Sequence, residues 1–190
     1  VSEANQFASL KVMALRNLGM INRRRQNFTL AVDYFQQQLD VETELINETG
    51  IAIATAHLAE VAFDKFEYSE ARDKAEQAIA IMQEDGGHGP KAMPMRVLAD
   101  VLLTEGDIDE AIRLLEEALE IDKAQNAPVG TALRHSKLGE VHLERGDFDR
   151  AADHLQLAQA ASPDRHFVLK LQAQIEAARG NEKSALQSME

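Results

Sequence analysis

The stretch GDIDEAIRLLEEALE, residues 106–120, decides the fold because its pattern recurs along the chain. Forty residues later, at 146–160, the chain reads GDFDRAADHLQLAQA, with the same opening and an alanine at the same place. The first copy also carries three carboxylates in four residues, Asp107, Asp109 and Glu110. A recurring segment calls for a structural explanation of these acids before a chemical one.

The composition indicates an ordered, all-α protein. Hydrophobic residues make up 45% of the 190-residue chain, which is enough for a packed core. Only four prolines and ten glycines interrupt a sequence rich in Ala, Leu, Glu and Gln. These side chains lose little conformational freedom on entering a helix, so we expect helices rather than sheets.

The acidic charge excludes several function classes. A formal net charge of −12 argues against nucleic-acid binding, which needs a basic face, and against binding to an anionic membrane surface. No apolar run approaches the ~20 residues of a membrane span, and no signal peptide is recognisable. The absence of cysteine removes disulfides and thiolate chemistry and suits a reducing cytosol, so a cytoplasmic location is expected.

Alignment on the alanine of the opening pattern reveals five copies. The first four alanines are 40 residues apart and the fifth follows after 34: Ala31, Ala71, Ala111, Ala151 and Ala185. Thirteen residues before each of the first four stands a leucine, Leu18, Leu58, Leu98 and Leu138, followed by glycine or alanine. A bulky apolar residue lies three residues before the same alanines, at Phe28, Tyr68, Ile108 and Phe148. Such columns predict two amphipathic helices per unit, packed closely at the small residues.

These columns place the helices and the repeats. We expect first helices near 3–24, 51–64, 91–104, 131–144 and 165–178, and second helices near 29–46, 69–84, 109–124, 149–161 and 183–190. Short turns separate them within each unit, at 26–27, 66–67, 106–107, 146–147 and 180–181. The repeats are then about 11–50, 51–90, 91–130, 131–164 and 165–190, in a single solenoid domain spanning 1–190. The start at Val1 and the short last repeat suggest a piece of a larger protein.

The leucine and its small neighbour, the apolar residue near the turn and the alanine resemble the tetratricopeptide repeat (TPR) over about residues 11–190. The usual period of that family is about 34 residues. The longer period here is similar to the long-repeat subclass of Pins-type scaffolds, kinesin light chain and bacterial regulators. This resemblance implies a right-handed superhelical solenoid of antiparallel helix pairs, with an incomplete last repeat. It also implies that the first helices line a concave surface, which usually binds a peptide.

The sequence offers no support for an enzyme, a metal site or a cofactor. A calcium loop would need an oxygen ligand where Ala111 stands and a glycine where Ile112 stands. The column of Thr29, Ser69, Asp109 and Asp149 instead fits the cap or first turn of a helix. GGHGPK, at 86–91, lacks the ending of a phosphate loop and is interpreted as an inter-repeat loop.

Two groups of side chains keep alternative interpretations. His135 and His142 lie two turns apart on one expected helix, and His154 could face His142 across the helix pair. Packing is favoured over a two-imidazole metal site, because zinc prefers more ligands. The basic run of Arg23, Arg24 and Arg25 either stabilises the end of its helix or captures an acidic partner.

The remaining face of the first helices predicts a partner-binding groove. Its first row is apolar and is either core or groove: Met13, Ile53, Met93, Leu133 and Phe167. The predicted binding residues follow along that face: Arg16, Met20, Arg23, Arg24, Glu60, Phe63, Asp64, Arg96, Asp100, Leu103, Ser136, Glu140, Leu143 and Lys170. Apolar residues beside acids suit an amphipathic partner that carries some basic residues.

We therefore expect a non-catalytic scaffold that binds a peptide or helix of another protein in its concave groove. The alternative is a regulatory or sensor segment of a larger signalling or transcription protein, binding an effector or a neighbouring domain. The clamp by which some family members hold a terminal carboxylate is not expected, because Met20 and Glu60 replace its polar side chains. Self-association is a further alternative, through the apolar Leu186 and Met189 of the incomplete last repeat.

Overall fold

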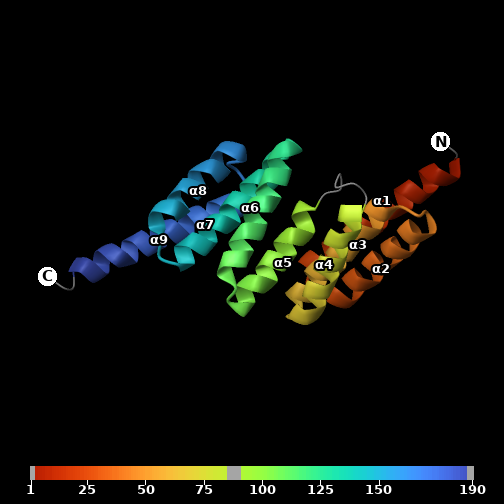
Figure 1. The fold of residues 1–190 in the computed structure, drawn as a ribbon, viewed down its shortest axis with the longest axis horizontal. Coiled ribbons are helices and arrows are strands. Elements are labelled where there is room, and N and C mark those ends of the chain that lie inside the picture. Colours follow the sequence, from red (N-terminus) through yellow and green to blue (C-terminus); the bar gives the residue numbers. More distant parts are fainter. Residues whose placement is uncertain (1–2, 85–90, 188–190) are drawn as a thin grey trace. The chain divides into compact units, whose positions relative to one another are not determined.

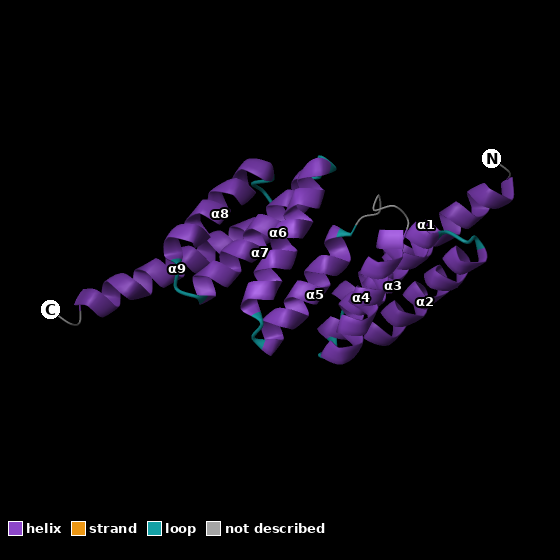
Figure 2. Ribbon diagram, viewed as in Figure 1, coloured by secondary structure: helices purple, strands orange, loops and turns teal. Residues whose placement is uncertain are grey.

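The computed structural model describes residues 3–84 and 91–187, and within these ranges the chain forms nine helices and no strand (Figures 1 and 2). The helices are α1 (Glu3–Arg24), α2 (Phe28–Glu44), α3 (Glu48–Asp64), α4 (Tyr68–Glu84), α5 (Ala92–Glu105), α6 (Ile108–Ala124), α7 (Pro128–Glu144), α8 (Phe148–Ala161) and α9 (His166–Gln187). The predicted all-α repeat fold is confirmed. No helix in the described ranges has the length and apolarity needed to cross a membrane.

The helix boundaries agree with the sequence pattern to within three residues for α1 to α8. α3 begins three residues earlier than expected because the side chain of Asn47 accepts a hydrogen bond from the backbone N–H of Gly50, at 3.3 Å. α7 also begins three residues early, with Pro128 in its first turn. Proline is favoured there because its missing N–H would have had no intrahelical partner.

The predicted turn at 180–181 and the separate helix from 183 are wrong up to residue 187. α9 continues as one helix from His166 to Gln187, and residues 188–190 lie outside the described ranges. The earlier units start their second helix with a bulky apolar residue, such as Phe148, whereas the fifth copy has Glu182 in that column. Without that apolar residue the sequence provides no anchor that would fold a second helix back onto the first.

The chain divides into two compact units, Val1–Asp107 and Ile108–Glu190. In the first unit α2 packs between α1 and α3, α4 packs between α3 and α5, and α3 also contacts α5. In the second unit α7 packs against α6, α8 and α9, and α8 also contacts α9. First helices of successive repeats are therefore neighbours within each unit, and side chains on them can meet.

The alanine column is buried on the second helices α2, α4, α6 and α8. Ala31, Ala71, Ala111 and Ala151 have no solvent-exposed surface, while the side chain of Ala185 lies outside the described residues. The small residue of the first helix is equally constrained. A Cβ atom added to Gly19 would lie 2.5 Å from the ring of the fully buried Phe35. The close approach of first and second helices therefore depends on small side chains.

The first four predicted turns within repeats each contain a residue in the left-handed conformation. Gly106 and Gly146 have φ of 86° and 75°, and Gln26 and Phe66 take the same place with φ of 61° and 64°. In the last of the described turns of this kind, the N–H of Asp147 donates to the carbonyl of His142, at 2.9 Å. The turn thus satisfies a carbonyl that the helix end leaves free.

Gly180→Ala tests the continuity of α9, and Gly106→Ala, in a turn with positive φ, provides the contrast. Gly180→Ala should stabilise the protein by about 0.5–1 kcal/mol, because a Cβ there meets nothing within 4 Å and alanine favours a helix interior. Gly106→Ala should instead destabilise it by about 1 kcal/mol, because Gly106 has a positive φ. Urea unfolding followed by circular dichroism measures both. Destabilisation by Gly180→Ala would indicate that the helix ends there.

Candidate partner-binding site

Five of the predicted groove residues form an ion-pair network on the first helices of unit 1. Arg23 on α1 donates to Glu60 on α3, at 2.9 Å, and to Asp64, at 2.7 Å. Arg96 on α5 donates to Asp100, at 2.7 Å, and also forms an ion pair with Glu60. Glu60 therefore bridges arginines from the preceding and the following repeat.

Burial makes this network a structural element as well as a surface feature. The side chain of Glu60 is only 9% exposed. Burial alone would raise its pKa, but Arg96, the hydrogen bond with His57 and the charge of Arg23 lower the pKa of Glu60 to about 2. Burial would lower the pKa of Arg96, but Glu60 and Asp100 raise it. Glu60 and Arg96 therefore stay ionised at neutral pH. The network as a whole sets two arginines against three carboxylates.

A hollow of about 470 Å³ lies beside the network in the same unit. Three apolar side chains, one from each first helix, line it: Met20, Ile53 and Met93. Polar groups complete the lining: Arg16, Asn17 and His57. The apolar row that we left open between core and groove thus contributes Ile53 and Met93 to a surface hollow.

His57 connects the hollow to the ion-pair network and to the core. Its ring stacks on Phe35 with 4.8 Å between ring centroids, and its Nδ1 lies 3.3 Å from Glu60 Oε2. Arg16 differs from Arg23 and Arg96, because it forms no ion pair with any residue whose side chain the structure describes. The hollow thus combines apolar anchors with one guanidinium that has no ion-pair partner among the described side chains.

The other predicted residues of unit 1 are placed differently. Phe63 is half-buried and packs against two core clusters, one around Ala59 and Val97 and the other around Ala62 and Val101. Leu103 is also half-buried, whereas Arg24 is exposed at the end of α1. Phe63 therefore contributes to the stacking of repeats, and only part of its ring remains open to a partner.

In unit 2 the predicted residues do not form a comparable network. Glu140 on α7 accepts from Lys170 on α9 at 2.7 Å, and Lys137 lies 3.8 Å away. Ser136 is 2% exposed, and Leu143 packs partly buried against the cluster around Leu171. Lys170 is 60% exposed, so a charged partner group could exchange with it.

Three of the histidines of unit 2, His135, His142 and His154, come together more closely than the sequence pattern suggested. His135 Nδ1 lies 3.1 Å from His154 Nδ1, and the ring of His142 stacks on His154 with 5.3 Å between centroids. Burial, and next the charges of His135 and His142, lower the pKa of His154 to about 4. No group of three or more metal-ligating side chains in the described residues is arranged to hold an ion.

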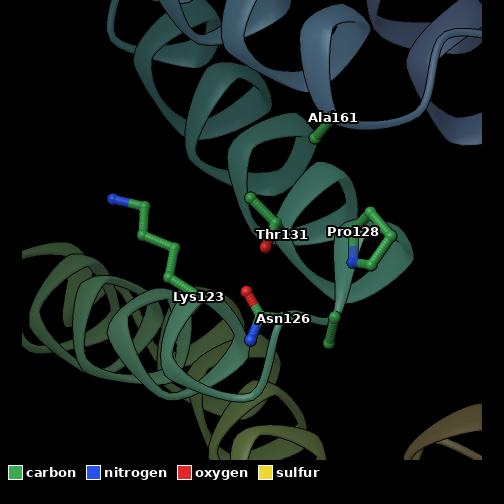
Figure 3. Close-up of a pocket in the computed structure, with 6 residues that line it drawn as sticks. Lys123, Asn126, Pro128, Thr131 and Ala161 are labelled. Atoms are coloured by element: carbon green, nitrogen blue, oxygen red, sulfur yellow. The ribbon is translucent and has the colours of Figure 1, made fainter.

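Unit 2 also has a hollow of about 320 Å³, where α6, the start of α7 and the end of α8 meet (Figure 3). Its lining includes Lys123, Asn126, Pro128, Thr131 and Ala161. Lys123 already donates to Glu120, at 2.9 Å. The lining has fewer large apolar side chains than the hollow of unit 1, so it offers a partner less to bury.

The carboxylates of the opening stretch belong to the scaffold. Asp109 and Glu110 lie in the first turn of α6, as expected for acids that complement a helix start. Asp109 accepts from Arg145 at 2.6 Å, and Glu110 accepts from Arg113 at 2.8 Å. In the next copy the cap itself is Asp147, whose side chain accepts from the N–H of Arg150 at 3.2 Å.

Sequence reasoning missed Asn17 and His57, and it treated the groove charges as free. The ion pairs between repeats could have been predicted from the sequence separation of the charged residues. Arg96 follows Glu60 by 36 residues and Glu60 follows Arg23 by 37, which is one repeat less one helical turn. A search for opposite charges at that separation would also have found Arg145 with Asp109, again 36 apart.

Comparison with known proteins agrees with this arrangement. The tetratricopeptide repeat model matches residues 11–84, 51–124 and 92–164. The chain therefore belongs to the tetratricopeptide repeat family. Comparison with curated protein sequences gives no match.

Solved structures share the fold at low sequence identity. The crystal structure of BtubC (BKLC) from P. vanneervenii has a TM-score of 0.67 at 18% sequence identity, over 97% of this chain and 90% of its own. The structure of nearly identical TPR-like repeats of a putative kinesin light chain from Podosopora anserina has a TM-score of 0.61 at 16% sequence identity. The match covers 90% of this chain and 96% of that chain. The structure of aspartyl phosphate phosphatase F from Bacillus subtilis has a TM-score of 0.77 at 13% sequence identity, over 99% of this chain and 49% of its own.

Removal of the central carboxylate tests the network. Glu60→Gln should destabilise the protein by about 3 kcal/mol, because it leaves the guanidinium of Arg96 buried with less compensating charge. Urea unfolding at pH 7 measures the change. The exposed pair of Glu110 and Arg113 provides the control, and Glu110→Gln should alter stability little. Equal effects of the two substitutions would contradict a structural role for the network.

Acid should destabilise the histidine cluster. The lowered pKa of His154 means that the folded form keeps the ring neutral, while the unfolded chain protonates it near pH 6.5. Stability from this group is therefore present above pH 6.5 and is lost as the pH falls towards 4. The melting temperature should decrease over this range, and less so in His154→Leu. An unchanged slope in the variant would rule out His154 as the cause.

Proposed function

We propose that the chain is a non-catalytic interaction module that binds a peptide or helix of a partner protein along the first-helix face of unit 1. The observation that carries this proposal is the hollow lined by Met20, Ile53 and Met93 beside the ion-pair network. Concave, apolar sites with a few polar groups are the usual form of binding sites. Membership of a family of helical repeats is consistent with such a role.

The partner's apolar side chains would fill the hollow. Met20 and Met93 suit this role because unbranched, polarisable thioethers adapt to differently shaped ligands. The three apolar side chains come from three successive repeats, so a bound segment would cross α1, α3 and α5. A segment of this kind gains affinity from one or two large anchors rather than from its whole length.

Charge would set the partner's orientation. Arg16 and Arg23 are seven residues apart on α1, about 10 Å along the helix axis. A carboxylate of the partner would face Arg16, and its basic residues would face the network, where three carboxylates outnumber two arginines. The amphipathic partner with basic residues, expected from the sequence, is thus retained with one added acidic group.

Unit 2 by itself carries further residues that the sequence predicted for partner binding. Glu140 and the exposed Lys170 form an ion pair that a partner's charged group could replace. Leu143 offers a half-buried apolar surface near them on the same helix as Glu140. A cytoplasmic location is part of the proposal and depends on the absence of cysteine from the sequence.

A regulatory role within a larger protein is the second candidate. The chain spans about half the length of the Bacillus subtilis aspartyl phosphate phosphatase F chain and of the RapI chain, whose folds it shares. At 13% and 18% identity these similarities indicate the fold alone. Binding of an isolated effector without any partner peptide would favour this candidate.

Selection from a random peptide library tests the first candidate. Peptides selected on the chain should be rich in apolar residues, and Met93→Asp should weaken their binding at least ten-fold, because it replaces an apolar wall of the hollow by a carboxylate that an apolar anchor would have to desolvate. Arg16→Glu should weaken the binding of peptides that carry an acidic residue. Isothermal titration measures both affinities, and circular dichroism checks the fold.

A second-helix variant provides the matched control. Lys74→Glu changes charge by the same amount as Arg16→Glu, but it lies on α4, outside the lining of the hollow. Selected peptides should bind this variant as they bind the unchanged chain. Binding that is lost in Lys74→Glu and kept in Met93→Asp would overturn the proposed site.

A further inference from the structure

The methionines that the structure describes differ in their access to solvent. Met82 and Met95 are buried, with 1% and 3% of their surface exposed. Met20 on α1 and Met93 on α5 are half-buried, and both line the hollow of unit 1. Met13 is 45% exposed and lies outside that lining. Two of the three apolar walls of the hollow are therefore thioethers that solvent can reach.

A thioether in contact with water is open to oxidation. The sulfur attacks one oxygen of hydrogen peroxide with a lone pair, the O–O bond breaks, and an S–O bond forms. The sulfur is oxidised by two electrons to a sulfoxide, and the second peroxide oxygen leaves as water. The chain contains no cysteine, so no thiol of its own competes for the oxidant. Met20 and Met93 are therefore accessible oxidation sites in the proposed binding surface.

Oxidation would change the character of both methionine walls. A sulfoxide places a strong hydrogen-bond acceptor where the thioether offered an apolar, polarisable surface. An apolar anchor of the partner would have to remove water from that oxygen without replacing its hydrogen bonds. Ile53 contains no sulfur, so the oxidised hollow would keep one apolar wall out of three.

Oxidation of Met20 has a second consequence because of its neighbour on α1. Arg16 precedes Met20 by four residues, so the two side chains are neighbours on one face of the helix, and both line the hollow. Arg16 forms no ion pair with any residue whose side chain the structure describes. Its guanidinium can therefore donate to a sulfoxide oxygen on Met20. That oxygen then competes with the partner carboxylate that the proposed function places at Arg16.

We propose that Met20 and Met93 form an oxidation site that controls partner binding. Peroxide converts both thioethers to sulfoxides, and the hollow then releases its partner. This inference rests on the proposed function and adds a form of regulation to it. Reduction by a methionine sulfoxide reductase restores the thioethers and the binding. The ion-pair network beside the hollow contains no sulfur, so oxidation leaves it unchanged.

Mass spectrometry after brief exposure to hydrogen peroxide identifies the methionines that react. Met93 and Met95 provide a matched pair, because they are two residues apart on α5 and differ in burial. Fragmentation of the peptide that contains both should place the first added oxygen on Met93. Met20 should react on the same timescale as Met93, and Met82 should react later. Equal rates at Met93 and Met95 would overturn the proposed oxidation site.

Isothermal titration measures the effect of oxidation on binding. The probe is a peptide selected on the untreated chain that lacks methionine, cysteine and tryptophan, so that only the protein reacts. Peroxide should raise its dissociation constant at least ten-fold. In Met20→Leu combined with Met93→Leu, the dissociation constants before and after treatment should be equal, whatever the affinity of that variant. Met13→Leu should keep the ten-fold rise.

Glutamine variants test the polarity of the hollow without an oxidant. Met20→Gln and Met93→Gln keep the length of the side chain and place an amide oxygen near the position of the sulfoxide oxygen. Each should weaken binding of the selected peptide several-fold, with circular dichroism as the check of the fold. Met20→Gln should affect peptides with an acidic residue most, because its amide oxygen competes for Arg16.

The outcomes separate this inference from the proposed function. Peptide binding that survives complete oxidation of Met20 and Met93 overturns the oxidation control and leaves the binding site in place. A peroxide effect that persists in the double leucine variant overturns the assignment to these two residues. Selected peptides that bind Met93→Asp as well as the unchanged chain overturn the proposed site, and the oxidation control with it. Recovery of binding after treatment with the reductase supports both.

Discussion

The fully buried alanine at the same place in each helix pair is the constraint on which the rest of the structure depends. Its lack of a long side chain brings the two helices of a repeat close together, and the small residue of the first helix, such as Gly19 against Phe35, completes that contact. Repeating the contact every 40 residues brings successive first helices together within each unit. The ion-pair network and the hollow of unit 1 are consequences of that spacing.

The sequence pattern predicted most of this scaffold because helix packing depends on apolar and small residues that recur with a regular period. It failed at α9, where the pattern predicted a turn at Gly180 although the apolar residue that begins each earlier second helix is replaced by Glu182. A glycine permits a turn but does not cause one when no neighbouring surface attracts the chain. The absence of an apolar residue at position 182 was therefore a better indicator of a continuous helix than Gly180 was of a turn.

The candidate site was predicted less well because charged side chains are placed by their neighbours in space. Arg23, Glu60 and Arg96 were correctly assigned to one face, yet their mutual ion pairs depend on contacts between residues 36 and 37 apart. Burial then makes the loss of one partner costly, because the remaining charge would stay buried without compensation. His57 was overlooked because a single histidine on an apolar helix gives no periodic signal, although its ring stacks on Phe35.

The bridge made by Glu60 has a consequence for how this face can diverge. A carboxylate held by arginines of two neighbouring repeats cannot be substituted alone without leaving charge buried. Substitutions at positions 23, 60 and 96 are therefore coupled. Substitutions of Met20, Ile53 and Met93 are not coupled in this way, since each side chain contributes only shape to the hollow. Single substitutions of these apolar side chains can therefore change ligand specificity, while the ion-pair network beside them stays the same.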